Sequence, residues 1–191
     1  MVGTGRGLTS TVPPIPGFEP EDDLEHALAA DPTLREGWAW GKPRKGHPEG
    51  SVGAHVGHLL EQIDEWGETG ERRRELRFLA LVHDGLKHEV RDWLPRSGEN
   101  HHAMRARRHA EHFTDDERLL STLELHDRPY SLWRRMGRKG EPDEKGFARM
   151  LERLADPALF LRFVELDGST EGKNPEPVRW LDQELRRRGA L

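Results

Sequence analysis

Apolar side chains recur every three or four positions along most of the chain from residue 51 onward, which is the spacing of amphipathic helices. Ser51 stands where a helix N-cap is expected, and Gly67 stands where that helix would end. A second helix is predicted from about Glu71, and a third from Asn100 as its cap to about Phe113. Further helical segments are predicted at residues 119–126, 147–154, 160–167 and 178–185. No stretch shows sustained apolar/polar alternation, so the pattern predicts an all-α fold.

The domain organisation follows from the length and from the position of glycine and proline. A chain of 191 residues fits one domain better than two. Residues 1–20 hold four glycines and four prolines with little periodic hydrophobicity, which predicts a flexible N-terminal arm. Residues 21–191 are then one helical domain, in which a second Pro/Gly-rich stretch, Gly41 to Gly50, leads into the first strong helix.

The composition is polar, with 34% hydrophobic and 34% charged residues and a net charge of -5. No apolar run approaches the roughly 20 residues of a membrane span, and no basic segment followed by an apolar stretch begins the chain. The acidic balance argues against general binding to nucleic acid or to a membrane surface. We therefore expect a soluble, cytoplasmic protein, with its oligomeric state open.

Two residue counts change this picture. The chain has no cysteine, which excludes disulfides, thiolate nucleophiles and cysteine-ligated zinc. It has 11 histidines and one tyrosine, an unusual balance for this length. Because histidine is the commonest protein metal ligand, this surplus directs attention to a metal site.

Several of these histidines, together with two aspartates, fall on the predicted apolar faces of helices. Burying an unpaired polar group costs about 1–3 kcal/mol, so such positions call for a partner. A lone inward histidine is more often a hydrogen-bonded core residue than a ligand, but a whole set of metal-ligand type favours a shared site. His101 competes with His102 for one place, and the spacing to Ala106 and His109 favours His102. The candidate metal ligands are His55, His83, Asp84, His102, His126 and Asp167.

The segment Leu81 to Lys87, with the sequence LVHDGLK, resembles the signature of the HD-domain superfamily of metal-dependent phosphohydrolases. In that family a helix histidine precedes an adjacent His-Asp pair, and a distant aspartate completes the metal site. The resemblance covers roughly residues 48–170 and implies an HD-type helical bundle. By this resemblance, His55 is the first histidine, His83-Asp84 is the pair and Asp167 is the last aspartate. His102 and His126 match the two further histidines of binuclear members.

One departure from the family pattern concerns the residues after the pair. Many members read His-Asp-Ile-Gly-Lys, whereas this chain has Gly85 and Leu86 transposed before Lys87. The lysine keeps its offset, so the resemblance still implies that it contacts the substrate. A second His-Asp pair occurs at residues 126 and 127, and we expect Asp127 to orient a ligand histidine. Pro129 is expected to end the preceding helix.

The histidine and carboxylate donors suit one or two divalent ions, Mn²⁺, Fe²⁺, Co²⁺, Ni²⁺, Zn²⁺ or Mg²⁺. Two ions bridged by Asp84 would activate a water for attack on phosphorus. The resemblance implies hydrolysis of a phosphate ester or anhydride in a nucleotide or another small phosphorylated metabolite. We expect Lys87 to contact a phosphate oxygen and Asp92 to act as a general acid or base. Arg96 and Arg128 are weaker candidates for holding phosphate charge.

The sequence leaves two other functions open. A branch of the same superfamily uses two irons and dioxygen to oxidise inositol or phosphonate carbons, and the six candidate ligands resemble that branch equally well. The third possibility is a non-catalytic sensor that binds a nucleotide and signals to a partner. The near-complete ligand set counts against the sensor, because a pure binding module has little need of a pair of metals.

Overall fold

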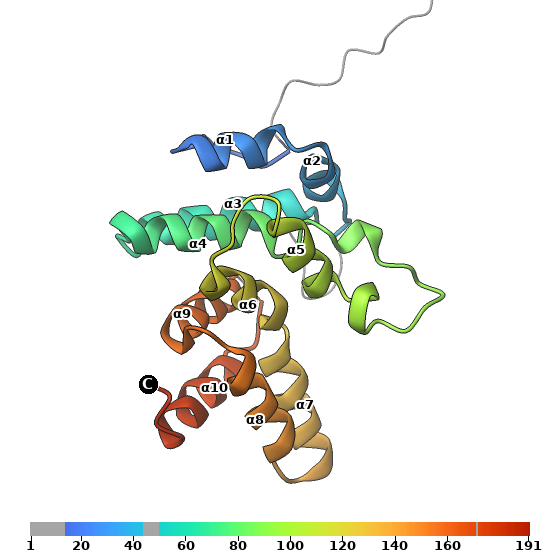
Figure 1. Cartoon of the computed structure of the whole chain (residues 1–191), viewed down its shortest axis with the longest axis vertical. Coiled ribbons are helices and arrows are strands. Elements are labelled where there is room, and N and C mark those ends of the chain that lie inside the picture. The colour runs from blue at the N-terminus through green and yellow to red at the C-terminus, as the bar shows by residue number, and fades with distance from the viewer. Residues whose placement is uncertain (1–13, 44–49, 171) are drawn as a thin grey trace, which may run out of the picture.

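The computed structural model describes residues 14–43, 50–170 and 172–191. Ten α-helices and two short 3₁₀ helices form in these ranges, and no strand does, which confirms the predicted all-α class (Figure 1). The helices are α1 (Asp23–Ala30), α2 (Pro32–Ala39), α3 (Val52–Glu65), α4 (Gly70–Val82), α5 (His102–Ala110), α6 (Glu117–Leu125), α7 (Arg128–Lys139), α8 (Glu144–Arg153), α9 (Pro157–Gly168) and α10 (Glu176–Arg187). The 3₁₀ helices are η1 (Lys87–Glu89) and η2 (Gly98–Asn100).

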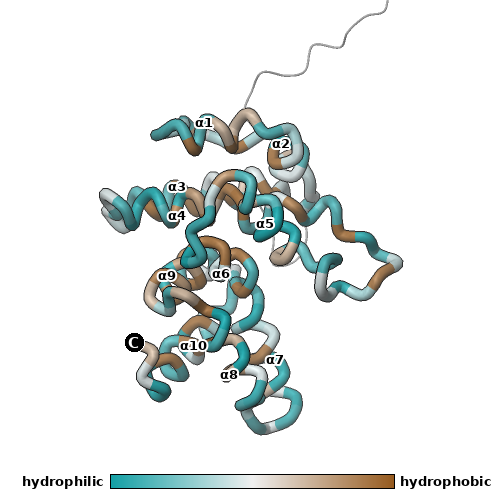
Figure 2. Tube along the Cα trace, in the orientation of Figure 1, coloured by the Kyte–Doolittle hydropathy of each residue, from teal (hydrophilic) through white to brown (hydrophobic). Residues whose placement is uncertain are grey.

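Two clusters of buried apolar side chains hold the helices together, and α9 belongs to both. Leu159 and Phe163 of α9 pack with residues from the N-terminal part of the fold, α1 to α6. Phe160 and Val164 of the same helix pack with α7, α8 and α10. Figure 2 shows hydrophobic positions on α6 and α9 between the two groups of helices. Side chains from both groups therefore come together around α9.

The predicted start of α3 is confirmed, whereas the predicted cap of α5 is wrong. The Ser51 side chain accepts a hydrogen bond from the Ala54 amide and caps α3 as expected. Asn100 does not cap α5, because His101 occupies that position. The buried Asn100 amide instead accepts from the Arg91 amide and donates to backbone oxygens in the loop before it. Asn100 thus holds the loop between η1 and η2 in shape.

Three helices were absent from the sequence prediction: α1, α2 and α7. The first two have only eight residues each, which gives the hydrophobic period little length in which to appear. The helix before Pro129 ends as expected, at Leu125, but Pro129 itself lies in the first turn of the next helix, α7. Proline is well tolerated there because the first-turn amides have no partner within the helix.

The predicted arm also needs correction where the structure describes it. Ile15 and Phe18 are buried in the first apolar cluster, so residues 14–20 pack on the domain instead of forming an arm. Residues 1–13, the rest of the predicted arm, lie outside the described residues, as do residues 44–49 of the second Pro/Gly-rich stretch. On either side of that gap, Gly41 and Ser51 form an isolated antiparallel bridge.

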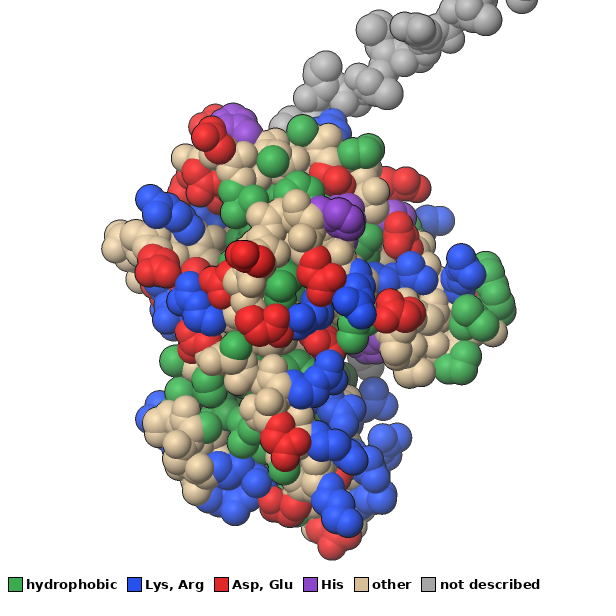
Figure 3. All heavy atoms as spheres, viewed as in Figure 1, with side chains coloured by type: hydrophobic (Ala, Val, Ile, Leu, Met, Phe, Trp, Pro, Cys, Tyr) green, Lys and Arg blue, Asp and Glu red, His purple; other side chains and the backbone are tan. Residues whose placement is uncertain are grey.

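Charged side chains of both signs are interspersed over much of the visible surface (Figure 3). Basic side chains gather most densely on the part of that face formed by α7 and α8. Elsewhere arginines pair with acids, as Arg73 does with Glu21 and Arg186 with Asp182. Within the described ranges, no helix has both the length and the apolar character needed to cross a bilayer.

Helix α2 braces the turn that follows α4, where the His-Asp pair lies. The Trp38 indole donates to the Leu81 carbonyl over 2.8 Å. A Cβ atom on Gly37 would lie 1.7 Å from the Gly85 carbonyl oxygen, and one on Gly85 would lie 2.7 Å from a Leu34 methyl carbon. Position 37 therefore requires glycine, because the atom that it faces is backbone, whereas the Leu34 methyl that faces position 85 is the end of a side chain.

We expect Gly37→Ala to destabilise the protein by at least about 2 kcal/mol, because the added methyl meets backbone that cannot rotate away. Thermal unfolding followed by circular dichroism measures this change. Gly137→Ala on α7 is the matched control, since its Cβ would meet open space, and we expect it to be neutral or stabilising by up to about 1 kcal/mol. Equal melting temperatures for the two variants would contradict the close α2 packing.

Candidate metal centre

The His-Asp pair lies at the C-terminal end of α4, with both side chains buried. The His83 Nδ1 atom lies 3.0 Å from the Ala80 carbonyl oxygen. Because a carbonyl only accepts, Nδ1 carries the proton, and Nε2 keeps its lone pair for a ligand. The Phe163 ring packs edge-on against the imidazole at 5.4 Å and fixes its orientation. Local helix geometry therefore aims His83 Nε2 into the interior.

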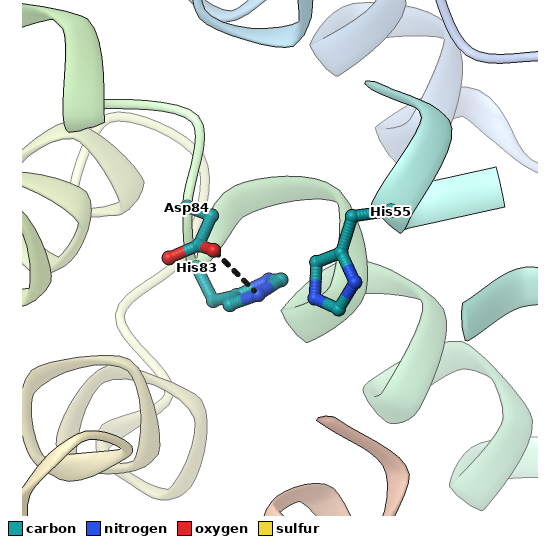
Figure 4. A group of neighbouring side chains, drawn as sticks. All are labelled: His55, His83 and Asp84. Atoms are coloured by element: carbon teal, nitrogen blue, oxygen red, sulfur yellow. Dashed lines mark ion pairs between the residues drawn. The ribbon is translucent and has the colours of Figure 1, made fainter. Parts of the chain in front are cut away.

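His55 on α3 and Asp167 on α9 approach the pair from separate helices. Figure 4 shows His55 beside His83 and Asp84. Asp167 Oδ1 lies 3.0 Å from His55 Nε2 and 3.8 Å from His83 Nε2. Asp84 Oδ2 lies 3.4 Å from His83 Nε2. The donor atoms of His55, His83 and Asp84 all lie within 4.8 Å of one another, close enough to hold one ion.

His102 and His126 form a second group on the other side of Asp84. The His102 Nε2 atom lies 3.5 Å from Asp84 Oδ1, and the His126 Nε2 atom lies 3.8 Å from it. His126 Nδ1 is 2.7 Å from the Leu123 carbonyl oxygen, the same orienting contact that His83 makes. The donors of this group also lie within 4.8 Å of one another.

Asp84 is common to both groups, and its two oxygens divide between them. Oδ2 faces His83, whereas Oδ1 faces His102 and His126. A carboxylate with histidines on each side is the arrangement that a bridging ligand between two ions requires. The structure thus brings all six candidate ligands into one cluster, in which His102 and Asp167 are half-buried and the other four are buried.

The charges around these carboxylates keep them ionised. Burial alone raises the pKa of Asp84, but the Lys87 ammonium and His83 hold it well below its usual range. Burial likewise raises the pKa of Asp167, but Lys173 and His55 outweigh the effect of burial and hold the pKa well below its usual range. The Lys87 ammonium contacts Asp84 Oδ2, and Lys173 Nζ lies 2.8 Å from Asp167 Oδ1. Both carboxyl groups are therefore in the form that binds a cation.

His126 holds a proton in the ion-free protein. Burial disfavours the charged ring, but Asp127 and Asp84 outweigh it and raise the pKa of His126 to about 9. His102 Nε2 and His126 Nε2 lie only 3.3 Å apart, a separation at which one of the two nitrogens carries a proton. A cation bound at this position would have to displace that proton.

The donor set fits a divalent cation. The buried atoms His83 Nε2 and Asp84 Oδ1 make no hydrogen bond of normal geometry with any described residue. Leaving buried polar atoms without a hydrogen bond is costly, and a bound ion would satisfy both. Imidazole nitrogens with carboxylate oxygens and no thiolate suit borderline to hard divalent ions. These residues can therefore hold a metal ion, although the donor types do not select one metal.

Of the adjacent His101 and His102, only His102 takes the ligand position for which both were candidates. The His101 Nδ1 atom accepts from the Ala103 amide as part of the N-cap of α5, and its ring stacks on His102 at 4.8 Å. His102 directs Nε2 into the cluster, as expected. Asp127 contacts this same nitrogen, at 3.1 Å, and not the ring's other nitrogen. This placement corrects its expected role, because a carboxylate that orients a ligand histidine would contact the nitrogen facing away from the metal.

A pocket of about 460 Å³ opens on the cluster. Asp84, Lys87, His126 and Asp167 form part of its wall, so Lys87 is at the site as predicted. Lys173 also lines the pocket and was missed. It follows α9, beyond the stretch that resembles the HD family, and a lysine in an irregular segment carries no periodic signal. The remaining wall includes Tyr130 and apolar side chains from α7, α9 and α10.

The structure does not bring Asp92 to the centre. After α4 the chain forms η1 and then enters the loop that projects from the body in Figure 1. Asp92 is 84% exposed and pairs with Arg96, which is 73% exposed. Arg128 is exposed at the start of α7 and is absent from the pocket wall. The exposed position of Asp92 therefore argues against its expected acid-base role.

Comparisons of the chain with family models, with curated proteins and with solved structures found no match.

Proposed function

We propose that this protein is a metal-dependent phosphohydrolase of the HD-domain type, acting on a phosphate ester or anhydride of a small metabolite. The observation that carries the proposal is Asp84, whose Oδ2 faces His83 and whose Oδ1 faces His102 and His126, beside a lysine-lined pocket. His55, His83 and Asp167 would hold a cation on one side of Asp84, and His102 and His126 would hold one on the other. The order of these residues along the chain is the order that the HD signature implies.

Bound divalent ions would supply Lewis acidity and lower the pKa of water at neutral pH. The chain's own contribution is positioning. Ala80 and Leu123 carbonyls fix the rings of His83 and His126, so that each Nε2 faces the cluster before any ligand arrives. Such preorganisation avoids the cost of ordering the donors during the reaction.

Lys87 and Lys173 bring positive charge to the pocket wall. Burial lowers the pKa of Lys87, but Asp84 outweighs it, and the net shift is upward, so Lys87 is an ammonium at neutral pH. Ammonium groups donate charge-assisted hydrogen bonds to phosphate oxygens. Two such groups at one pocket favour a substrate that carries a phosphoryl group. Their role is to bind and orient that group beside the buried carboxylates.

The deciding experiment combines metal analysis with two activity assays on the full chain. The protein is loaded separately with Mn²⁺, Fe²⁺, Co²⁺, Zn²⁺ or Mg²⁺, and each form is assayed for phosphate release from a panel of nucleotides and phosphate esters. Phosphate release that disappears on chelation supports the proposal. Oxygen uptake by the iron-loaded form without phosphate release would assign the chain to the oxygenase alternative. A protein that binds none of these metals would overturn both.

Metal binding to the second group should release a proton. Because His126 has a pKa of about 9 without ions and binds metal only when neutral, affinity should rise about tenfold per pH unit up to pH ~9 and then level off. Titration calorimetry in buffers of different ionisation enthalpy measures the released protons. At pH 7.5 we expect about one proton from this group. A pH-independent affinity between pH 7 and 9 would contradict the assignment.

A further inference from the structure

Asp127 stands at a helix start without capping it. It is the N-cap residue of α7, yet its side chain makes no cap hydrogen bond. In the described chain, aspartates also begin α1, α2, α6, α8 and α9, and all five accept a hydrogen bond from an amide in the first turn. A cap hydrogen bond contributes about 1 kcal/mol to helix stability, so Asp127 lacks a contribution that the other five aspartates make.

The Asp127 carboxylate faces the second group of donors instead. Its Oδ2 lies 3.1 Å from His102 Nε2, and its Oδ1 lies 3.9 Å from His126 Nε2. These are the same two nitrogens that face Asp84 Oδ1, at 3.5 and 3.8 Å. Asp127 therefore shares the side of both rings on which an ion would lie. Its side chain is 46% exposed and lines the pocket, so it meets the cluster from the solvent side.

We propose that Asp127 is a metal ligand, and that it completes a second four-donor cation site with Asp84, His102 and His126. The inference rests on the proposed metal centre and adds to it a ligand that the HD signature does not supply. The consequence is a near-equivalent pair of sites. Each has two imidazoles and one carboxylate of its own, Asp167 in the first and Asp127 in the second, and the two share Asp84.

A ligand role and an orienting role for Asp127 predict different effects on metal binding. A carboxylate that only held the His102 ring would lose its hydrogen-bonding partner once a cation occupied Nε2, and its removal would weaken metal binding by no more than the about 10–100-fold that loss of an outer partner costs. A ligand instead matters for one ion only. The two roles therefore differ in metal stoichiometry, which is measured without any substrate.

The test is a Co²⁺ titration of the full chain, followed by calorimetry and by elemental analysis after gel filtration. We expect two Co²⁺ ions per wild-type chain. In Asp127→Ala and Asp127→Asn, the second dissociation constant should rise more than about 100-fold, since loss of an outer partner alone costs about 10–100-fold. The first ion should keep its affinity. In a His55→Ala background, which weakens the first site, adding Asp127→Ala should remove the remaining ion.

Asp115→Asn is the matched control, because this aspartate is exposed and lies just before α6. It should bind two ions with wild-type affinity. Since Asp127 makes no cap bond, its variants should keep the wild-type circular dichroism spectrum, and the asparagine variant preserves the shape if alanine does not. Two ions bound with unchanged affinity in both Asp127 variants would overturn the ligand role of Asp127 and leave the proposed metal centre in place. A wild-type chain that binds no Co²⁺, Mn²⁺ or Zn²⁺ would overturn the metal centre itself.

Discussion

Asp84→Ala should lose both ions and reduce turnover by more than about 100-fold, a larger loss than removing an outer partner causes. The reason is that, among the residues that the structure describes, Asp84 is the carboxylate shared by both groups of histidines. Elemental analysis and the phosphate-release assay measure the two effects on the same preparation. His83→Ala should weaken the first ion most, because its Nε2 lies beside Asp84 and Asp167.

Circular dichroism separates this outcome from simple unfolding. Both variants should keep a helical spectrum, because α4 is held by many buried apolar side chains besides the pair. Asp84→Asn preserves the shape of the side chain and should also lose metal, which guards against a packing defect in the alanine variant. Retained turnover in Asp84→Ala and His83→Ala would rule out the site.

Phe163→Ala should be the most destabilising of the apolar substitutions around the centre. Phe163 is fully buried on α9, and its ring contacts the imidazoles of His83 and His126 at 5.4 and 6.3 Å. Replacing a buried phenylalanine with alanine costs about 3–5 kcal/mol, which corresponds to a fall in Tm of roughly 10 °C for a chain of this size. The metal affinity should fall too, because the ring fixes one histidine from each group.

Phe160→Ala provides the comparison, since Phe160 lies on the same helix, is equally buried and packs in the second apolar cluster. It should lower Tm by a similar amount and leave the metal affinity near that of the wild-type protein at temperatures where both variants are folded. Equal losses of metal affinity in the two variants would show that α9 acts through general stability and not through the ring contacts.

The order of chemistry-bearing residues in the sequence predicted the cluster well. His55, His83, Asp84, His102, His126 and Asp167 each fell on an apolar face, and helix periodicity was enough to place them inward. What periodicity cannot give is the direction of an individual atom. Whether a carboxylate contacts one ring nitrogen or the other depends on the angle between helices.

The errors have equally local causes. Asp92 was chosen because it follows the pair closely in the sequence, whereas α4 ends there and the chain turns outward. Lys173 approaches Asp167 from an irregular segment whose path no sequence pattern specifies. Helix α7 was missed because Pro129 was treated as a stop, although the same residue is compatible with a first turn.

The position of α9 between the two apolar clusters has a mechanical consequence. The first four helices of the site, α3 to α6, carry or precede His55, the pair, His102 and His126, whereas Asp127 and Asp167 belong to α7 and α9. Bound ions would join the two groups of helices at this junction, in addition to the apolar contacts that α6 and α9 make in both clusters. Metal occupancy and the rigidity of the junction would then rise and fall together.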